Sequence, residues 1–241
     1  MSDAPVVLWQ MQPAWGLANP SPFCMKVETW LRMAKIPYVA KALLRPPKSR
    51  SKKIPYIERP DGTLLADSSV ILETLGQERG VTLDDGLSED DRALGVLLQR
   101  TFEEDLYFIA LFERWAIGDN WEIVEPAYFA AVPWIIRRTV VPFVRRGVLA
   151  SAYGQGVARL DDEQRHRKGE ADLAAVSRIL GDKLFFFERP SSYDAIAYAF
   201  LANIIHAPIA SRTAEAAREH ENLVRYCERM QAAYFPEFNR A

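Results

Sequence analysis

The sequence predicts an α/β domain over residues 1–80 followed by an all-helical domain over residues 88–241. Before residue 80, short apolar runs that contain β-branched residues alternate with helical patterns, as in a small sheet covered by helices. After the polar, glycine-containing segment 79–91, apolar residues recur only at helical spacing. The 241 residues, of which 49% are hydrophobic, are enough to bury a sizeable core.

The first two elements are a strand and an amphipathic helix. The run VVLWQM at residues 6–11 is short and apolar and predicts a buried strand. The helix begins near residue 22 and ends before Pro37, because a proline restricts the residue that precedes it. Apolar residues at helical spacing predict its buried face: Phe23, Val27, Trp30 and Leu31. We expect three charged residues to face solvent: Lys26, Glu28 and Arg32.

The rest of the α/β domain reads as three strands and a helix. The strands are predicted at residues 38–44, 54–58 and 63–66, where β-branched and apolar residues cluster. The Pro60, Asp61 and Gly62 sequence predicts a tight turn that pairs the last two strands. A second helix begins at Asp67. The order of strand, helix, strand, hairpin and helix is thioredoxin-like.

The second domain begins with a helix-capping pattern. Ser88 and Asp91 are three residues apart and precede a long periodic run that extends toward Trp115. Each proline in a helix removes an amide donor and crowds the preceding turn. We therefore expect three prolines to divide the middle of the chain into short helices: Pro126, Pro133 and Pro142.

Three further helices complete this domain. One runs from near Asp161 to Leu180 and ends at Gly181, a usual C-terminal cap. The next repeats the capping pattern with Ser191 and Asp194, and its apolar residues face nearly every side. Such a helix is expected at the centre of a bundle. The last helix carries apolar residues at helical spacing: Leu223, Tyr226 and Met230.

Composition excludes several classes of protein. The net charge of −2 indicates no general attraction to nucleic acid or to an anionic membrane. The N-terminus lacks a secretory pattern, so a cytoplasmic protein is expected, and no apolar run reaches the length of a membrane span. Cys24 and Cys227 predict no disulfide in a reducing compartment. The three histidines lack metal-ligand spacing, so no metal is expected.

The opening SPFC of the first helix is a candidate catalytic site. Ser21 at the N-cap and Pro22 at the first helical position are ordinary capping residues, in which the serine oxygen accepts from an unpaired amide. A helix N-terminus also stabilises a thiolate or another anion through its dipole and free N–H groups. The residues alone leave both interpretations open.

A second candidate site lies at the third predicted strand. If the Ile54–Pro55 peptide is cis, the backbone of Ile54 is left free to pair with an incoming peptide. Further along, Asp67 and Ser68 open the next helix. A carboxylate and a hydroxyl beside free amides can hold the ammonium and carboxylate of an amino acid, although both residues also suit simple capping.

Four motifs in order resemble the glutathione S-transferase superfamily. They are SPFCMKVE at the first helix, KIPYIE at the cis-proline strand, LADSSVI at the second helix and RPSSYDAIAYAFLA at the buried helix. The resemblance covers most of the chain and implies the glutathione transferase fold. The SPFC opening, the GDKLFFFERPSSYDA segment and the arginine-rich middle are most similar to the metaxin and failed-axon-connections branch and its bacterial relatives.

This resemblance implies a set of site residues. Ser21 takes the position of the residue that activates the thiol of glutathione. The residues expected to bind glutathione are Ser21, Phe23, Ile54, Pro55, Asp67 and Ser68. Lys53, in the basic run 48–53, is expected to attract the glycine carboxylate of glutathione. Cys24 is the last residue of a Cys-x-x-Cys-like segment in which Ser21 replaces the first cysteine. We therefore interpret Cys24 as a packed residue rather than as a nucleophile.

The resemblance implies three candidate functions. The first is a glutathione transferase that uses glutathione as cosubstrate against a small hydrophobic electrophile, as in detoxification. The second is a non-catalytic interaction protein with the same fold, and the third is a glutathione-dependent thiol reductase working through Cys24. A homodimer is compatible with the family. The segment from Arg137 to Arg146 suits a membrane surface, an acidic cosubstrate or arginines that only cover apolar surface.

Overall fold

The computed structural model describes residues 4–43, 47–49, 52–130 and 132–238. Its α/β domain contains a four-stranded sheet in the order β2-β1-β3-β4. β2 is parallel to β1, while β3 is antiparallel to both β1 and β4. The elements are β1 (Val6–Gln10), α1 (Pro22–Met33), β2 (Tyr38–Ala42), β3 (Tyr56–Glu58), β4 (Leu64–Ala66) and α2 (Ser68–Arg79). The predicted thioredoxin-like order is confirmed.

The hairpin between β3 and β4 turns where the sequence predicts it. The amide of Gly62 donates to the carbonyl of Arg59 at 2.9 Å. Gly62 has φ +83°, a left-handed conformation that glycine adopts without steric conflict. The register that follows from this turn places Ile57 opposite Leu65.

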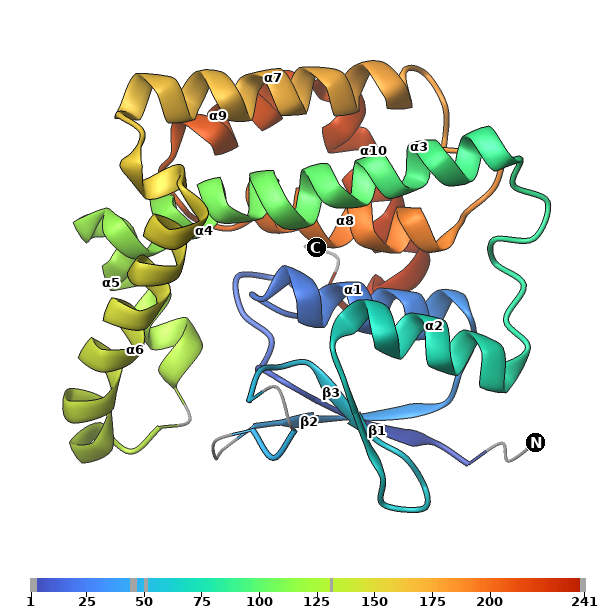
Figure 1. Cartoon of the computed structure of the whole chain (residues 1–241), viewed down its shortest axis with the longest axis horizontal. Coiled ribbons are helices and arrows are strands. Elements are labelled where there is room, and N and C mark those ends of the chain that lie inside the picture. The colour runs from blue at the N-terminus through green and yellow to red at the C-terminus, as the bar shows by residue number, and fades with distance from the viewer. Residues whose placement is uncertain (1–3, 44–46, 50–51, 131, 239–241) are drawn as a thin grey trace.

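The helical domain lies on the far side of α1 and α2 from the sheet (Figure 1). A continuous rod begins at the predicted capping box of Ser88 and Asp91 and contains one π-helical turn, η1. The elements are α3 (Glu89–Arg100), η1 (Thr101–Leu106), α4 (Tyr107–Ala116), α5 (Gly118–Phe129), α6 (Trp134–Gln155), η2 (Val157–Arg159), α7 (Asp162–Leu180), α8 (Ser192–Ile205), α9 (Arg212–Glu219), α10 (Glu221–Tyr234) and η3 (Pro236–Phe238). This combination confirms the predicted fold class.

The expectation for the prolines is only partly correct. Pro133 stands at the start of α6, but Pro126 and Pro142 lie inside α5 and α6, which continue through them. Both inner prolines are exposed. Water can therefore solvate the carbonyl groups that lose their amide partners.

The expectation of a solvent-facing side on α1 is wrong. Lys26 and Glu28 are 0% and 4% exposed, because α1 is packed between the sheet, α2, α8 and α10. Glu28 accepts hydrogen bonds from Gln10, at 2.6 Å, and from Tyr38, at 2.8 Å. Arg32, at the end of the helix, is partly exposed and pairs with Glu28.

Helix α8 forms the centre of the helical domain, as predicted. Asp194 is fully buried, and its carboxylate accepts from the amides of Phe186 and Ser191 and from the hydroxyls of Ser191 and Tyr226. Burial raises the pKa of Asp194, whereas these donors lower it. Asp194 therefore joins the loop before α8 to α10, as well as capping the helix.

We predict that Asp194→Ala lowers the free energy of unfolding by about 3 kcal/mol or more, because several buried donors lose a charged acceptor. The matched control is Asp91→Ala, which removes the equivalent capping residue at the exposed start of α3. It should lose only about 0.5 to 2 kcal/mol. Urea unfolding followed by circular dichroism measures both, and equal losses would contradict the joining role of Asp194.

Candidate active site

The register of the sheet brings the three segments with candidate site residues to the same end of the sheet. Trp9 faces Tyr56, and Tyr56 faces Ala66. Because β3 is antiparallel to β1 and β4, the end of β1, the start of β3 and the end of β4 lie together. The loop to Ser21, the Ile54–Pro55 peptide and Asp67 are attached at these points. The structure thus gathers residues that are 46 positions apart in the sequence.

The Ile54–Pro55 peptide is cis, as predicted. Pro55 is buried, and Ile54 is partly exposed at the edge of the site. The role of Ile54 in pairing with a peptide ligand stays a prediction. Lys53, beside it, is exposed, and Arg50 and Ser51 of the same basic run lie outside the described residues.

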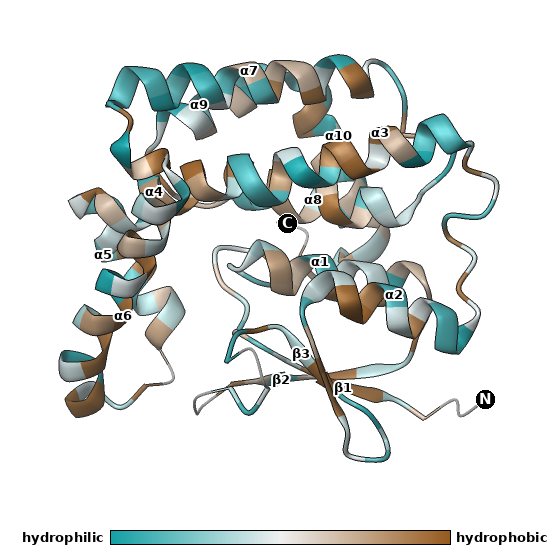
Figure 2. Ribbon diagram, in the orientation of Figure 1, coloured by the Kyte–Doolittle hydropathy of each residue, from teal (hydrophilic) through white to brown (hydrophobic). Residues whose placement is uncertain are grey.

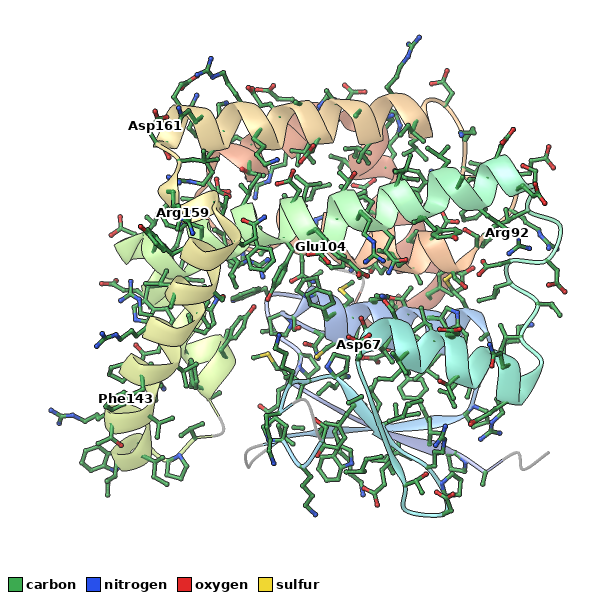
Figure 3. All side chains as sticks on the ribbon, in the orientation of Figure 1. Asp67, Arg92, Glu104, Phe143, Arg159 and Asp161 are labelled. Carbon is green, nitrogen blue, oxygen red and sulfur yellow. The ribbon has the colours of Figure 1, made fainter. Side chains whose placement is uncertain are left out.

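Asp67 is held in an unusual conformation at the start of α2, on the side that faces the helical domain (Figure 3). Its φ of +77° is rare for a residue other than glycine. Its Oδ1 accepts from the amides of Ser69 and Val70 at 3.0 and 3.2 Å, while Oδ2 accepts neither bond. Asp67 is exposed, so a carboxylate oxygen is presented beside a helix N-terminus. Backbone strain of this kind is concentrated at functional sites.

A buried lysine lies behind the serines that follow Asp67. The Lys26 ammonium donates to the hydroxyl oxygens of Ser68, at 3.1 Å, and Ser69, at 2.9 Å. It also forms an ion pair with Glu103 at 2.6 Å. Burial lowers the pKa of Lys26, and the Glu103 carboxylate raises it. The network joins α1, α2 and η1.

This network orients the two hydroxyl groups. A serine hydroxyl that accepts from an ammonium can still donate its own proton elsewhere. Ser69 accepts a second bond, from Gln99 at 3.0 Å. The hydroxyl groups of Ser68 and Ser69 are therefore polarised so that they can donate to an anionic ligand. Sequence reasoning missed Gln99 and Glu103, and it placed Lys26 wrongly on the solvent-facing side of the helix.

Ser21 stands at the N-cap of α1, but its side chain bonds no amide of that helix. The capping expectation is therefore wrong for the hydroxyl. The residue is held by its backbone instead: its amide donates to Oδ1 of Asn19 at 3.0 Å, and Asn19 donates to the carbonyl of Met11 at 2.9 Å. The hydroxyl lies beside the thiol of Cys24.

Cys24 is 0% exposed. Burial raises the pKa of its thiol to about 12, although hydrogen bonds from Ser21 and the Met11 backbone lower it. At neutral pH the thiol is therefore almost entirely protonated. Cys24 behaves as a packed residue of the first helical turn.

The helical domain fixes the residue before Ser21. Arg114 is only 5% exposed, and it donates to the carbonyl of Pro20 at 3.0 Å and to Asn203. The hydroxyl of Tyr128 also donates to the carbonyl of Pro20, at 2.9 Å. Sequence reasoning missed this contact, and only Asn203, a lone amide in the apolar run of α8, gave a signal for it.

Aromatic side chains surround the start of α1. The Phe23 ring packs edge-on against Tyr107 and Phe200, with centroids at 4.8 and 5.2 Å. Trp15, in the loop, lies against Tyr128 at 6.0 Å. Burial raises the pKa of Tyr107, whereas the nearby Arg114 guanidinium lowers it. Phe23, expected to bind glutathione, thus also contacts the helical domain.

Neither a metal-binding cluster nor a membrane-spanning helix is present among the described residues. No group of three His, Cys, Asp or Glu side chains among them is placed to hold a metal ion. In the same part of the chain, every helix is too short or too polar to cross a bilayer. Cys24 and Cys227 are free thiols, and both are buried.

Two family profiles match the chain. Residues 22–121 match the glutathione S-transferase N-terminal domain, and residues 169–230 match the glutathione S-transferase C-terminal domain. The isoprene-epoxide glutathione S-transferase of Rhodococcus sp. strain AD45 is 30% identical and aligns with 95% of this chain and 99% of its own length.

Other relatives confirm the expected branch. Failed axon connections of Drosophila melanogaster is 26% identical over 97% of this chain and 59% of its own length. The mitochondrial outer membrane import complex protein metaxin of Arabidopsis thaliana is 28% identical over 92% of this chain and 70% of its own length.

The fold is also similar to solved structures. A glutathione S-transferase of Methylobacterium radiotolerans, in complex with glutathione sulfonate, aligns with a TM-score of 0.60 at 19% identity. The alignment covers 98% of this chain and 93% of the other. At this identity the similarity concerns the fold alone.

We predict that Lys26→Met lowers the free energy of unfolding by about 3 to 5 kcal/mol, because it leaves the buried Glu103 carboxylate unpaired. The double variant Lys26→Met/Glu103→Gln should lose less than the sum of the two single variants. Arg100→Met is the control, since its ion pair with Glu104 is exposed on both sides and is worth about 0 to 1 kcal/mol. Additive losses in urea unfolding would show that the ion pair does not couple the helices.

Proposed function

The chain belongs to the glutathione S-transferase family. We propose that it is an enzyme that joins glutathione, through its thiol sulfur, to a small apolar electrophile. The observation that carries this proposal is the meeting of Ser21, the cis Ile54–Pro55 peptide and Asp67 at one end of the sheet. The cysteinyl part of glutathione would lie between Ser21 and Ile54. Its γ-glutamyl ammonium and carboxylate would bind Asp67 and Ser68.

The charges around this end of the sheet support the binding of glutathione. Asp67 offers a carboxylate to an ammonium. The hydroxyls polarised by Lys26 offer protons to a carboxylate. One α-amino acid group carries both charges, so this pattern matches the γ-glutamyl end of glutathione.

The start of α1 supports the activation of the thiol. A free thiol of pKa near 8.5 is only about 3% ionised at pH 7. The N-terminus of α1 favours an anion, and so does the Arg114 guanidinium that is bonded to Pro20. The Ser21 hydroxyl can add a charge-assisted hydrogen bond after a rotation about χ1 that turns it from Cys24 to the ligand.

The aromatic residues beside Ser21 support an apolar electrophile. The rings of Phe23 and Tyr107, one from each domain, pack edge-to-face beside Ser21. The Rhodococcus relative is described as acting on isoprene epoxide, so an epoxide is a reasonable first substrate to assay. In that reaction the thiolate sulfur of glutathione forms a bond to an epoxide carbon, the carbon–oxygen bond of that carbon breaks, and the resulting alkoxide takes a proton from solvent, so the product is a thioether of the whole glutathione molecule.

The other candidate functions have different support. A non-catalytic interaction protein is favoured by the Arabidopsis relative, which is described as a protein of an import complex. A thiol reductase has less support, because burial raises the pKa of Cys24 to about 12. In addition, Ser21 replaces the first cysteine of the Cys-x-x-Cys-like segment 21–24. The cytoplasmic location, the role in detoxification and the homodimer stay predictions.

We predict that Asp67→Asn weakens glutathione binding by roughly 10- to 100-fold, the value of a charge-assisted hydrogen bond. Asparagine still caps a helix and tolerates positive φ, so the fold should be unchanged. Isothermal titration calorimetry measures the affinity, and Asp61→Asn in the hairpin at the opposite end of β3 is the control. Unaltered affinity would remove Asp67 from the site. A wild-type protein that binds no glutathione would support the interaction protein instead.

We predict that Ser21→Ala raises the pKa of the bound glutathione thiol by about one to two units and lowers turnover, because a bond of roughly 1.5 to 3 kcal/mol is lost. Cys24→Ala is the matched control. It should leave both quantities unchanged, since its thiol is protonated at neutral pH. Ultraviolet absorbance of the thiolate, titrated against pH, gives the pKa. The reverse result, with turnover lost only in Cys24→Ala, would favour the reductase.

A further inference from the structure

Ser69, the residue after the predicted pair of Asp67 and Ser68, has both acceptor positions of its hydroxyl group occupied. Its oxygen accepts from the Lys26 ammonium at 2.9 Å and from the side-chain amide of Gln99 at 3.0 Å. A hydroxyl group has two lone pairs and one proton. That proton has no acceptor among the described residues, and the side chain is partly exposed. The hydroxyl of Ser69 is therefore left to donate to a group from outside.

Glu103 fixes the direction of both bonds to Ser69. A carboxylate only accepts hydrogen bonds, so the end of the Gln99 side chain that lies 3.1 Å from Oε2 of Glu103 is its NH2 group. The Lys26 ammonium donates to Oε1 of Glu103 at 2.6 Å and to Ser68 at 3.1 Å. Its three protons are thus used by Glu103, Ser68 and Ser69. Neither group can accept a proton from Ser69.

The backbone at the start of α2 leaves few other donors for an anion. Oδ1 of Asp67 accepts from the amides of Ser69 and Val70. Two of the N–H groups that bind anions at a helix N-terminus are therefore already occupied. An anionic group at this position depends on side-chain hydroxyls, and the hydroxyl of Ser69 is oriented for it.

The orientation of Ser69 comes from the helical domain. Gln99 lies in α3 and Glu103 in η1. Figure 2 shows hydrophilic residues in the middle of the rod that these elements form above α1 and α2. η1 is a π-helical turn, and such turns are frequent at functional sites. The donor therefore belongs to the α/β domain, whereas one of the two groups that orient it belongs to the helical domain.

A zwitterionic α-amino acid group matches the charges at this place. Oδ2 of Asp67 accepts neither of the two amide bonds and can take an ammonium. Ser69 can donate to a carboxylate. Lys26 and Glu103 neutralise each other, so their pair adds no net charge that would favour a simple anion. The γ-glutamyl end of glutathione carries an ammonium and a carboxylate on one carbon atom.

We propose that Ser69 binds the γ-glutamyl carboxylate of glutathione and that Gln99 is the positioning residue that orients its hydroxyl. The assignment rests on the proposed function and extends it, because the resemblance implies only Asp67 and Ser68 at this helix. It also makes the binding of glutathione depend on the contact between α2 and α3.

Two analogues of glutathione test the assignment of Ser69. The γ-aminobutyryl analogue lacks the α-carboxylate of the γ-glutamyl group, and the glutaryl analogue lacks its ammonium. Ser69→Ala should weaken glutathione and the glutaryl analogue by roughly 10- to 100-fold, the value of a hydrogen bond to a charged group. It should weaken the γ-aminobutyryl analogue by less than about twofold, because the partner of the hydroxyl is absent. Calorimetry measures glutathione, and displacement of bound glutathione measures the weaker ligands.

Gln99→Met tests the positioning role. It keeps the length of the side chain but removes the donor, so it should weaken glutathione by about two- to tenfold and spare the γ-aminobutyryl analogue. In a Ser69→Ala background it should have no further effect, because it acts through Ser69. The control is Ser177→Ala, which removes a hydroxyl that donates to Asn222 at 2.9 Å on α7, on the far side of the helical domain from the sheet (Figure 1). It should change none of the affinities.

The outcomes separate this assignment from the proposed function. If the wild-type protein binds glutathione but Ser69→Ala weakens all three ligands equally, Ser69 acts only on the fold and the assignment is wrong. Additive losses from Ser69→Ala and Gln99→Met would overturn the positioning role. If Ser69→Ala does not fold, Gln99→Met alone gives the contrast between glutathione and the γ-aminobutyryl analogue. A wild-type protein that binds none of the three thiols would overturn the proposed function and the assignment together.

Discussion

The enclosure of α1 is the constraint on which the rest of the structure depends. A helix enclosed by the sheet, α2, α8 and α10 leaves Lys26 and Glu28 without access to water, and only Arg32, at its end, is partly exposed. Lys26 must therefore find its partners inside, and it finds Glu103 and the hydroxyls of Ser68 and Ser69. An unpaired ion at such a position would be strongly destabilising. One buried ammonium group thus joins the two domains and polarises the serines of the proposed site.

Because both domains enclose α1, residues of both domains position the proposed site. The loop before Ser21 belongs to the α/β domain, but Arg114 and Tyr128 of the helical domain hold the carbonyl of Pro20. Asn203 of α8 donates to the carbonyl of Asn19, which in turn fixes the amide of Ser21. A catalytic hydroxyl gains from such support, because its position is set before the substrate arrives.

The sequence predicts those parts of the fold that depend on local signals, and it misses those that depend on enclosure. Turn residues and capping pairs identify the hairpin at Gly62 and the start of α8 at Ser191, because each acts over three or four residues. Lys26 could have been placed by spacing, since it is three residues from Phe23 and four from Trp30, both assigned to the buried face. Its charge argued for solvent, and the partner that overrules this argument, Glu103, lies 77 residues further on. The Ile54–Pro55 peptide and Asp67 were found through a resemblance, since each alone suits an ordinary edge or cap. Arg114 gave no signal, because its acceptors are backbone, hydroxyl and amide oxygens from three other segments.

The arginines show why residue type alone does not assign a function. Arg114 is buried, its donors are taken by oxygens of Pro20, Tyr128 and Asn203, and its charge acts on its surroundings. Arg138 and Arg146 have the same side chain, but they are exposed on α6 and form no ion pair within the described residues. A buried guanidinium held by neutral oxygens sets a local potential, and an exposed one without a partner is free to bind an anion from outside. The fold therefore uses a buried arginine to shape the surroundings of Ser21, and it leaves the two exposed arginines of α6 open to solvent.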